Sequence, residues 1–318
     1  MSLALAVVVI AGCKKKPKQD DQEPTSGKPA TGHSVTHKKA GGDDEGGGKA
    51  LGGVTAISAG GQHACAVADG KLYCWDGAAG PAEAKTDAPG PVQAVTNASC
   101  ALLEDGSVWC WPHHIQLQAA GRSGAGQVAA SDSDVCASRQ LFVWCWKPDD
   151  DSPRTQFDWP GIDRLVVGGG KTCSVVGGNE VECHDVASAQ GSRAEQIRDV
   201  QDVTGLAMAW NTTCAVHGKG NVDCWNDPSQ RLAIEGVANA TAVALGSDGD
   251  ACAITGGGAV SCWKLALAGP SLERPAAAVD GATATAIAVG VGFACALGGD
   301  KKVRCWTTDG GKPTVVGK

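Results

Sequence analysis

The chain has 318 residues, which allows one large domain or two ordinary ones. A net charge of −7 argues against nucleic-acid binding, which needs a basic surface, and the 45 glycines argue against long helices. The 15 cysteines are more informative, because an odd number in an exported protein leaves one of them without a partner in the chain.

The N-terminus accounts for the odd cysteine. An apolar run from Leu3 to Ile10 is too short to span a bilayer, which takes about 20 residues, but it fits the core of a signal peptide. The following "VIAGC" resembles the lipobox of bacterial lipoproteins, although no basic residue precedes the core. We therefore expect a signal peptide over residues 1–12 and lipidation of Cys13; an unlipidated secretory signal is the alternative.

Residues 13–53 combine mixed charge, glycine and proline with almost no large apolar side chains. Such a segment cannot offset the entropy of ordering by burial, so we expect a disordered, flexible tether. His33 and His37 lie in it and are expected to be solvated rather than to bind a metal.

The remaining 14 cysteines form seven pairs, and the first members of the pairs recur every 35 to 43 residues. This period is typical of repeat architectures. Each pair lies in alternating, glycine-punctuated sequence such as "CAVADGKLYCW", which indicates a β-hairpin and not a helix. The pairs are Cys65 with Cys74, Cys100 with Cys110, Cys136 with Cys145, Cys173 with Cys183, Cys214 with Cys224, Cys252 with Cys262, and Cys295 with Cys305.

The turns fix the register of these hairpins. Asp69-Gly70 fits a two-residue type I′ turn, and counting outward from it places Cys65 opposite Cys74. A three-residue loop at 104–106 gives the same result in the second copy. Opposed residues in a non-hydrogen-bonded pair approach to about 4.5 Å between Cα atoms, which a disulfide can bridge. We predict one disulfide per hairpin and hence an oxidising compartment.

Two alternatives to disulfides exist for these cysteines, zinc binding and burial as free thiols. Zinc sites usually place cysteines two to four positions apart, which this spacing does not match. Free, buried cysteines packing as small apolar groups are the better alternative.

A large ring follows the second cysteine of almost every pair. Being one residue further along the strand, it points to the opposite face of the sheet from the cysteine. We expect these rings to form the core between neighbouring sheets and not a cofactor site. They are Trp75, Trp111, Trp146, Trp225, Trp263 and Trp306, with His184 in the fourth copy.

Seven such sheets can close into a ring, so we predict an all-β, seven-bladed propeller over residues 54–318. The first copy begins abruptly at Val54, whereas an additional strand-like segment stands at the C-terminus. We therefore expect Pro313 to Val316 to complete the first blade.

The sequence "AGGQHACAV" joined to "DGKLYCW" at 59–75 resembles the repeat of the regulator of chromosome condensation family. The resemblance implies a seven-bladed β-propeller, and in repeat length the chain is similar to the short-repeat bacterial members, which include secreted inhibitors of β-lactamase. The chain lacks the long "G-x-N-x-x-G-Q-L-G" stretch of the eukaryotic members. Their chromatin and small-GTPase roles are therefore not expected here.

No catalytic constellation is present, and we expect no metal and no cofactor. "GGGKT" at 168–172 lacks the spacing of a phosphate-binding loop and matches a repeat turn instead. His113-His114 and Asp149 to Asp151 are expected at the surface, and calcium binding is the alternative for the acidic run.

One position varies from copy to copy, two residues before the first cysteine. The side chains there are expected to lie on one face of the disc, where unlike residues on a rigid repeat scaffold build recognition surfaces. The alternative is that they satisfy backbone groups of the blades. The candidate binding residues are His63, Asp134, Lys171, Thr212, Asp250 and Phe293, with Ala98 at the same position in the second copy.

Trp159 and Trp210 lie outside the repeated series and could either add contact area or pack in the core. Taken together, the sequence predicts a monomeric, non-catalytic binding or scaffold protein. It would be lipid-anchored to a bacterial envelope, with the outer membrane favoured, facing the periplasm or the exterior. Its partner would be an envelope or extracellular protein. The alternatives are an inhibitor of an extracellular enzyme and an enzyme with its site at the central channel.

Overall fold

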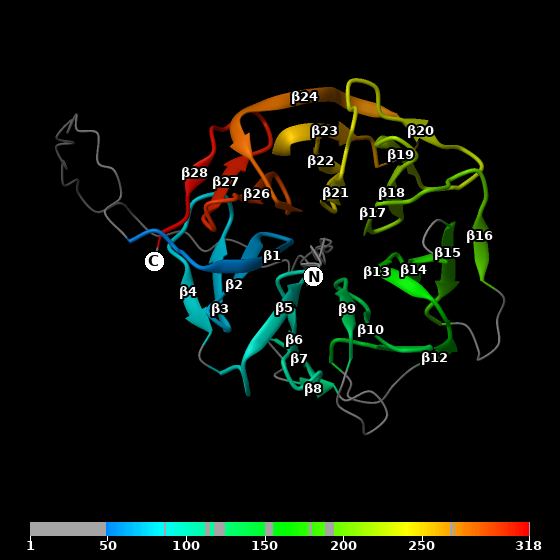
Figure 1. Cartoon of the computed structure of the whole chain (residues 1–318), viewed down its shortest axis with the longest axis horizontal. Helices are drawn as coiled ribbons and strands as arrows, with labels where there is room; N and C mark the ends of the chain where they lie inside the picture. Colours follow the sequence, from blue (N-terminus) through cyan, green and yellow to red (C-terminus); the bar gives the residue numbers. More distant parts are fainter. Residues whose placement is uncertain are drawn as a thin grey trace, which may run out of the picture.

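The computed structural model describes residues 49–317, apart from 86, 112–114, 118–124, 150–154, 178–179, 188–193, 268 and 270. Seven four-stranded antiparallel sheets are arranged as blades around a central axis, as Figure 1 shows. This confirms the predicted all-β, seven-bladed propeller. None of the described residues forms a helix long and apolar enough to cross a membrane.

The strands follow one another in chain order within each blade. Blades 1 to 4 consist of β1 (Val54–Gly60), β2 (His63–Ala68), β3 (Lys71–Asp76), β4 (Glu83–Lys85); β5 (Val92–Thr96), β6 (Cys100–Leu103), β7 (Val108–Cys110), β8 (Ile115–Leu117); β9 (Gln127–Ala130), β10 (Val135–Arg139), β11 (Phe142–Trp146), β12 (Thr155–Asp158); and β13 (Ile162–Gly168), β14 (Lys171–Val176), β15 (Glu180–Asp185), β16 (Glu195–Ile197). Blades 5 to 7 consist of β17 (Gly205–Ala209), β18 (Thr212–His217), β19 (Asn221–Trp225), β20 (Leu232–Ala233); β21 (Ala242–Leu245), β22 (Asp250–Ile254), β23 (Ala259–Leu265), β24 (Leu272–Thr283); and β25 (Ala286–Val289), β26 (Phe293–Leu297), β27 (Val303–Thr307), β28 (Thr314–Val315), with a short 3₁₀ turn, η2, at Gly256–Gly258.

The first strand of each blade is the innermost and packs against the first strands of both neighbours; β1 contacts β5 on one side and β25 on the other (Figure 1). All blades therefore present corresponding turns on the same side of the disc. We call the side with the turns between first and second strands the AB face; it is formed by residues 61–62, 97–99, 131–134, 169–170, 210–211, 246–249 and 290–292. The opposite side, the BC face, carries the turns between second and third strands at 69–70, 104–107, 140–141, 218–220, 255–258 and 298–302.

Each blade contains the predicted disulfide. In blade 1, Asp69 and Gly70 both have positive φ, at 50° and 70°, as a type I′ turn requires. The Cα atoms of the bonded cysteines lie 4.0 to 4.1 Å apart in all seven bridges, and the hairpin register read from the turn residues is confirmed. The bridges join Cys65 to Cys74, Cys100 to Cys110, Cys136 to Cys145, Cys173 to Cys183, Cys214 to Cys224, Cys252 to Cys262, and Cys295 to Cys305.

The two cysteines of a bridge differ little in their surroundings. The first members, on the second strand of each blade, expose at most 1% of their surface. The second members, on the third strand, are buried as well, and the most exposed of them is Cys74 at 9%. The bridges therefore lie inside the blades and are not part of a solvent-exposed redox site. The second members in blades 3, 4, 6 and 7 are Cys145, Cys183, Cys262 and Cys305, with exposures of 1%, 5%, 6% and 0%.

The turns of the BC face also join neighbouring blades. The carbonyl oxygen of Gly70 accepts a hydrogen bond, 2.9 Å long, from the backbone N–H of Val92, where the chain enters the next blade. Three other turn glycines accept the equivalent bond: Gly106 from Ala125, Gly220 from Ala240 and Gly258 from Ala284. The glycine at this position thus belongs to the turn of its own hairpin and also accepts a hydrogen bond from the chain that leads into the next blade.

The rings after the second cysteines form the core, as expected. Trp146 and Trp263 have no exposed surface, and Trp75, Trp225 and Trp306 expose 4% or less. His184, which replaces the tryptophan in blade 4, is also buried, and its ring packs edge-on against the indole of Trp159 with ring centroids 4.6 Å apart. Trp111 is the exception because it is only half-buried.

The ring does not close as the sequence suggested. Blade 1 has four strands of its own, and β28 pairs with β27 in blade 7. The expectation that Pro313 to Val316 completes the first blade is therefore wrong. The C-terminus still reaches blade 1, because Val316 and Gly317 accept hydrogen bonds from the N–H groups of Leu51 and Ala82, at 3.0 and 2.7 Å.

Residues 49–53 belong to the folded part rather than to the tether. Ala50 forms an isolated antiparallel bridge with Gly317, and Leu51 is fully buried beside Val316. Leu51 is the one large apolar residue between 49 and 53, so the sequence did not indicate that the folded part begins before Val54. The predicted signal peptide, Cys13 and residues 13–48 lie outside the described residues, as do His113, His114, Asp150 and Asp151.

Candidate functional site

The predicted ring of binding residues divides into two groups. His63 and Lys171 are exposed and Thr212 is half-buried on the AB face. In contrast, Asp134, Asp250 and Phe293 expose only 2 to 3% of their surface, and Ala98 exposes 6%. The buried members lie in blades 2, 3, 6 and 7, whose turns between first and second strands are longer than those of blades 1, 4 and 5.

Asp250 shows what the buried members do. Its carboxylate accepts hydrogen bonds from Arg274 at 3.1 Å and from the Thr308 hydroxyl, and Lys264 lies 3.5 Å away. Lys264 also contacts Asp248, whose carboxylate accepts a bond from the N–H of Gly292 in blade 7. These charges compensate one another and connect two blades, which is a structural role.

His63 and Thr212 each have a side-chain partner on the same hairpin. His63 Nδ1 lies 2.6 Å from Asp76 Oδ1, and the Thr212 hydroxyl donates to Asn226 Oδ1 at 2.8 Å. In both blades the partner stands two residues after the second cysteine, and in blade 1 it is paired directly across the hairpin. Continuing the register count by two pairs beyond Cys65 and Cys74 would have identified Asp76.

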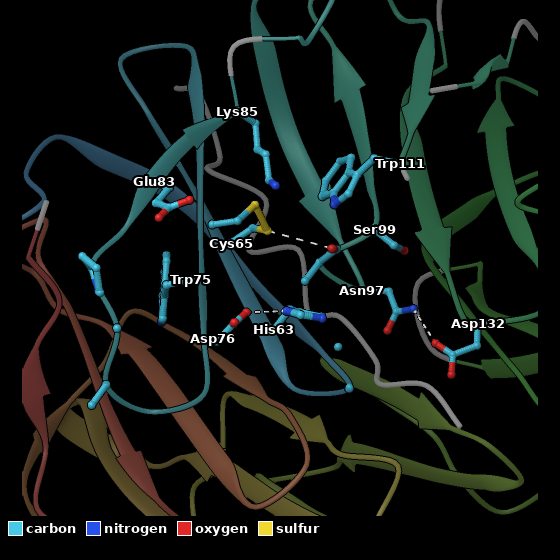
Figure 2. Close-up of a pocket in the computed structure, with 17 residues that line it drawn as sticks. His63, Cys65, Trp75, Asp76, Glu83, Lys85, Asn97, Ser99, Trp111 and Asp132 are labelled. Atoms are coloured by element: carbon cyan, nitrogen blue, oxygen red, sulfur yellow. Dashed lines mark hydrogen bonds and ion pairs between the residues drawn. A yellow bond between two sulfur atoms is a disulfide. The ribbon is translucent and has the colours of Figure 1, made fainter. Parts of the chain in front are cut away.

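A cavity of about 610 Å³ opens at this position between blades 1 and 2 (Figure 2). Its polar side chains come from four places: the hairpin ends of blade 1, the outer strand β4, the first turn of blade 2 and the first turn of blade 3. They are His63, Asp76, Glu83, Lys85, Asn97, Ser99 and Asp132, and the aromatic side chains are Trp75 and Trp111.

The turn of blade 2 shapes one wall of this cavity. Asn97 and Ala98 both adopt positive φ, at 48° and 44°, and the N–H of Ala98 donates to Ser58 Oγ at 2.9 Å. The Cys65 sulfur lies 3.9 Å from the Ala98 carbonyl oxygen; a disulfide sulfur carries no hydrogen to donate, so this is a packing contact. The strained turn is therefore held in place from blade 1.

Asn97 and Asp132 form the edge of the cavity towards blade 3. Asn97 is 4% exposed, and its Nδ2 donates to Asp132 Oδ1 at 3.3 Å, while its own Oδ1 is buried without a hydrogen-bond partner. Asp132 keeps exposed surface, yet the protein around it displaces enough water to raise the pKa of its carboxyl, and the bond from Asn97 only partly opposes this.

Ser99, His63 and Asp76 are the residue types of a serine-hydrolase triad, and the pairing of Asp76 with Nδ1 matches that arrangement. The third contact is missing, because no hydrogen bond joins Ser99 to His63 and Figure 2 shows the Ser99 hydroxyl directed away from the imidazole. Within the described residues, no group of three or more His, Cys, Asp or Glu side chains could hold a metal ion. The geometry suits binding more than acyl transfer.

A second cavity, of about 310 Å³, occupies the equivalent position between blades 4 and 5. Lys171 stands where His63 stands in blade 1, and it forms a 2.7 Å ion pair with Glu195. Trp210, on the neighbouring turn, is 47% exposed and has a φ of 49°. Of the two tryptophans outside the repeat series, Trp159 is thus a packing residue and Trp210 a surface one.

Comparison with known proteins agrees with the fold. No protein-family model and no curated protein matches the chain. The CRINKLY WD40 ectodomain of the Arabidopsis thaliana receptor kinase ACR4 is similar, with a TM-score of 0.58, 18% identity and coverage of 84% of this chain and 98% of that one. A chain of the mitotic checkpoint complex gives 0.57, 13% identity and coverage of 87% and 99%. Prp20p, the RCC1 protein of Saccharomyces cerevisiae, gives 0.49, 11% identity and coverage of 83% and 77%. At these identities the likeness to the first two structures concerns the fold alone.

Proposed function

We propose that this protein is a non-catalytic, protein-binding propeller whose AB face is the docking surface, held at a bacterial envelope by lipidation of Cys13. The observation that carries the proposal is the pair of cavities at equivalent positions, between blades 1 and 2 and between blades 4 and 5, both opening beside AB turns. A rigid disc with unlike side chains at repeated positions is how repeat proteins recognise partners.

The composition of the AB face supports a protein as the ligand. Trp210 provides an exposed aromatic side chain, of the kind that contributes most to protein interfaces, beside the charged pair of Lys171 and Glu195. The two cavities lie three blades apart, which suits a ligand as large as a protein domain better than a small molecule.

The inhibitor alternative would need a cluster of exposed aromatic side chains on one face. Among the described residues, Trp210 is the exposed tryptophan of the AB face, and half-buried Trp111 lies three blades away. The arrangement therefore favours a partner held by mixed polar and aromatic contacts.

The test compares the two faces in one protein. Full-length protein is immobilised, and captured envelope proteins are identified and quantified for an AB-face variant that combines Lys171→Glu with Trp210→Ala. The matched control alters the BC face by combining Lys219→Glu with Leu141→Ala, because Lys219 is exposed and Leu141 is 55% exposed. We expect the first variant to lose its partner by about tenfold or more, and the control to keep it. Equal capture by both variants would refute the proposal.

The proposed anchor has a separate test. When the full chain is produced in a bacterium, we expect the protein in the membrane fraction and Cys13→Ser in the soluble fraction, since acylation supplies the membrane affinity. An unchanged distribution of the serine variant would contradict lipidation at this residue and leave the binding proposal standing.

A further inference from the structure

Trp210 occupies a turn position that glycine occupies in the two matched blades. Blades 1, 4 and 5 share a two-residue turn between their first and second strands, and the first residues of these turns are Gly61, Gly169 and Trp210, with φ of 55°, 54° and 49°. Glycine adopts this left-handed conformation freely, whereas a residue with a Cβ is strained there. Trp210 is also 47% exposed. A strained and exposed aromatic residue at the edge of a cavity points to binding rather than to folding.

The cavity that Trp210 lines, between blades 4 and 5, has an apolar interior. The apolar residues Ile197, Met208 and Trp225 line it and expose only 2 to 4% of their surface. Its volume of about 310 Å³ lies within the range of small-molecule sites, roughly 300–1,000 Å³. A ligand of this cavity therefore needs an apolar face.

The polar residues of the same cavity are neutral as a group. Lys171 and Glu195 are its charged lining residues, and they form a 2.7 Å ion pair with each other. Asn226 accepts a hydrogen bond from the Thr212 hydroxyl through Oδ1, and its amide also carries two N–H donors. The cavity thus offers an ammonium, a carboxylate and an amide without an excess of either charge.

A sugar ring matches both parts of this lining. The C–H groups on one face of the ring can stack on the electron-rich face of an indole. Each hydroxyl can donate a hydrogen bond to a carboxylate while it accepts one from an ammonium or an amide. A purely apolar ligand would bury these polar groups without partners, and a charged ligand would have to compete with the existing ion pair.

We propose that the cavity between blades 4 and 5 binds a neutral sugar ring, with Trp210 as its stacking surface. Lys171, Glu195 and Asn226 are its hydrogen-bonding groups. The inference goes beyond the proposed function, because the sugar binds this cavity whether or not a protein docks on the AB face.

The test measures the binding of four neutral pyranoses to the full-length protein: glucose, galactose, mannose and N-acetylglucosamine. Calorimetry gives the affinity, and acrylamide quenching of tryptophan fluorescence reports on the exposed indole. We expect at least one sugar to bind with a Kd of about 1–10 mM, as suits a ligand of this size, and to shield the indole from the quencher. Glycerol, which has hydroxyls but no ring face, should not bind. No binding of any of the four sugars up to about 50 mM, or equal binding of glycerol, overturns the inference.

Variants of Trp210 separate binding from folding. Trp210→Gly removes the ring and supplies the residue type that the matched turns carry, so it should unfold in the same temperature range as the native protein. Its affinity for the sugar should fall by about tenfold or more, and Trp210→Phe should retain part of the affinity. Leu141→Ala on the BC face is the control and should leave binding unchanged. Sugar binding by Trp210→Gly as tight as that of the native protein would overturn the assignment.

The sugar and the protein partner are measured separately. If no sugar binds but capture of an envelope protein still depends on the AB face, the sugar assignment is wrong and the proposed function stands. If a sugar binds but the AB-face and BC-face variants capture equally, the sugar assignment stands and the proposed function fails.

Discussion

Gly60 of blade 1 lies directly against Asn97 of blade 2: a Cβ placed on Gly60 would be 2.2 Å from the carbonyl oxygen of Asn97. Contacts of the same kind recur on the AB face, where Gly169 faces Trp210 and Gly246 faces the carbonyl oxygen of Gly290. Neighbouring blades therefore meet backbone to backbone at this face, and the cavity between blades 1 and 2 opens beside the first of these contacts.

Gly60→Ala should destabilise the protein by about 1–3 kcal/mol, because the added methyl forces backbones of two blades apart. The control is Gly52→Ala, where a Cβ would meet nothing within 4 Å. Urea unfolding of both variants checks the expectation. An alanine at residue 60 as well tolerated as one at residue 52 would contradict the packing described.

Ring closure depends on Leu51, which is fully buried beside Val316 and donates its N–H to that residue. Leu51→Ala should cost about 2–5 kcal/mol through lost burial and the cavity left behind. Leu141→Ala, at a side chain 55% exposed, is the matched control and should be close to neutral. Thermal unfolding measures both, and a Leu51→Ala variant as stable as Leu141→Ala would contradict the role of Leu51 in closure.

Each hairpin disulfide should add to stability by restricting the unfolded chain. Replacing Cys214 and Cys224 together by alanine should lower the free energy of unfolding by about 2–4 kcal/mol. Peptide mapping without reduction should recover seven bridges, each within one blade. A bridge joining two different blades would contradict the fold.

Two aspartates should give opposite pH dependence. Burial raises the pKa of Asp132, so the folded protein favours the protonated carboxyl over the ionised form. The free energy of unfolding therefore falls as the pH rises above the ordinary pKa of 3.8, where the folded protein has to carry the ionised form. Asp132→Asn should therefore be at least as stable as the native protein at pH 7, with a difference that disappears at lower pH.

Asp300 behaves in the opposite way. A hydrogen bond from Arg304 lowers the pKa of Asp300 to about 2, so its stabilising effect is present above its ordinary pKa of 3.8 and is lost as the pH falls towards 2. Asp300→Asn should lower Tm at pH 7, and the deficit should shrink between pH 4 and 2. Parallel Tm curves for either variant and the native protein would contradict the assigned shifts.

Much of the fold was predictable because it is local. Asp69 and Gly70 set the turn, the turn sets the register, and the register brings Cys65 opposite Cys74 within ten residues of chain. The partner of the candidate residue His63 was equally accessible, since Asp76 follows from the same count. Asp132 was not, because it enters the cavity from blade 3 and no spacing within one repeat indicates it.

The sequence by itself determined the number of blades, the bridge in each and the rings between them, because each depends on contacts within one repeat or on a side chain's place along one strand. Only the tertiary structure decided how the circle closes and which turn residues remain exposed. Both depend on contacts between distant parts of the chain: Leu51 and Val316 meet from opposite ends of the propeller, and Asp250 is buried against Arg274 and against Thr308 of the next blade, whereas His63 is exposed. Those contacts are long-range and leave no period in the chain.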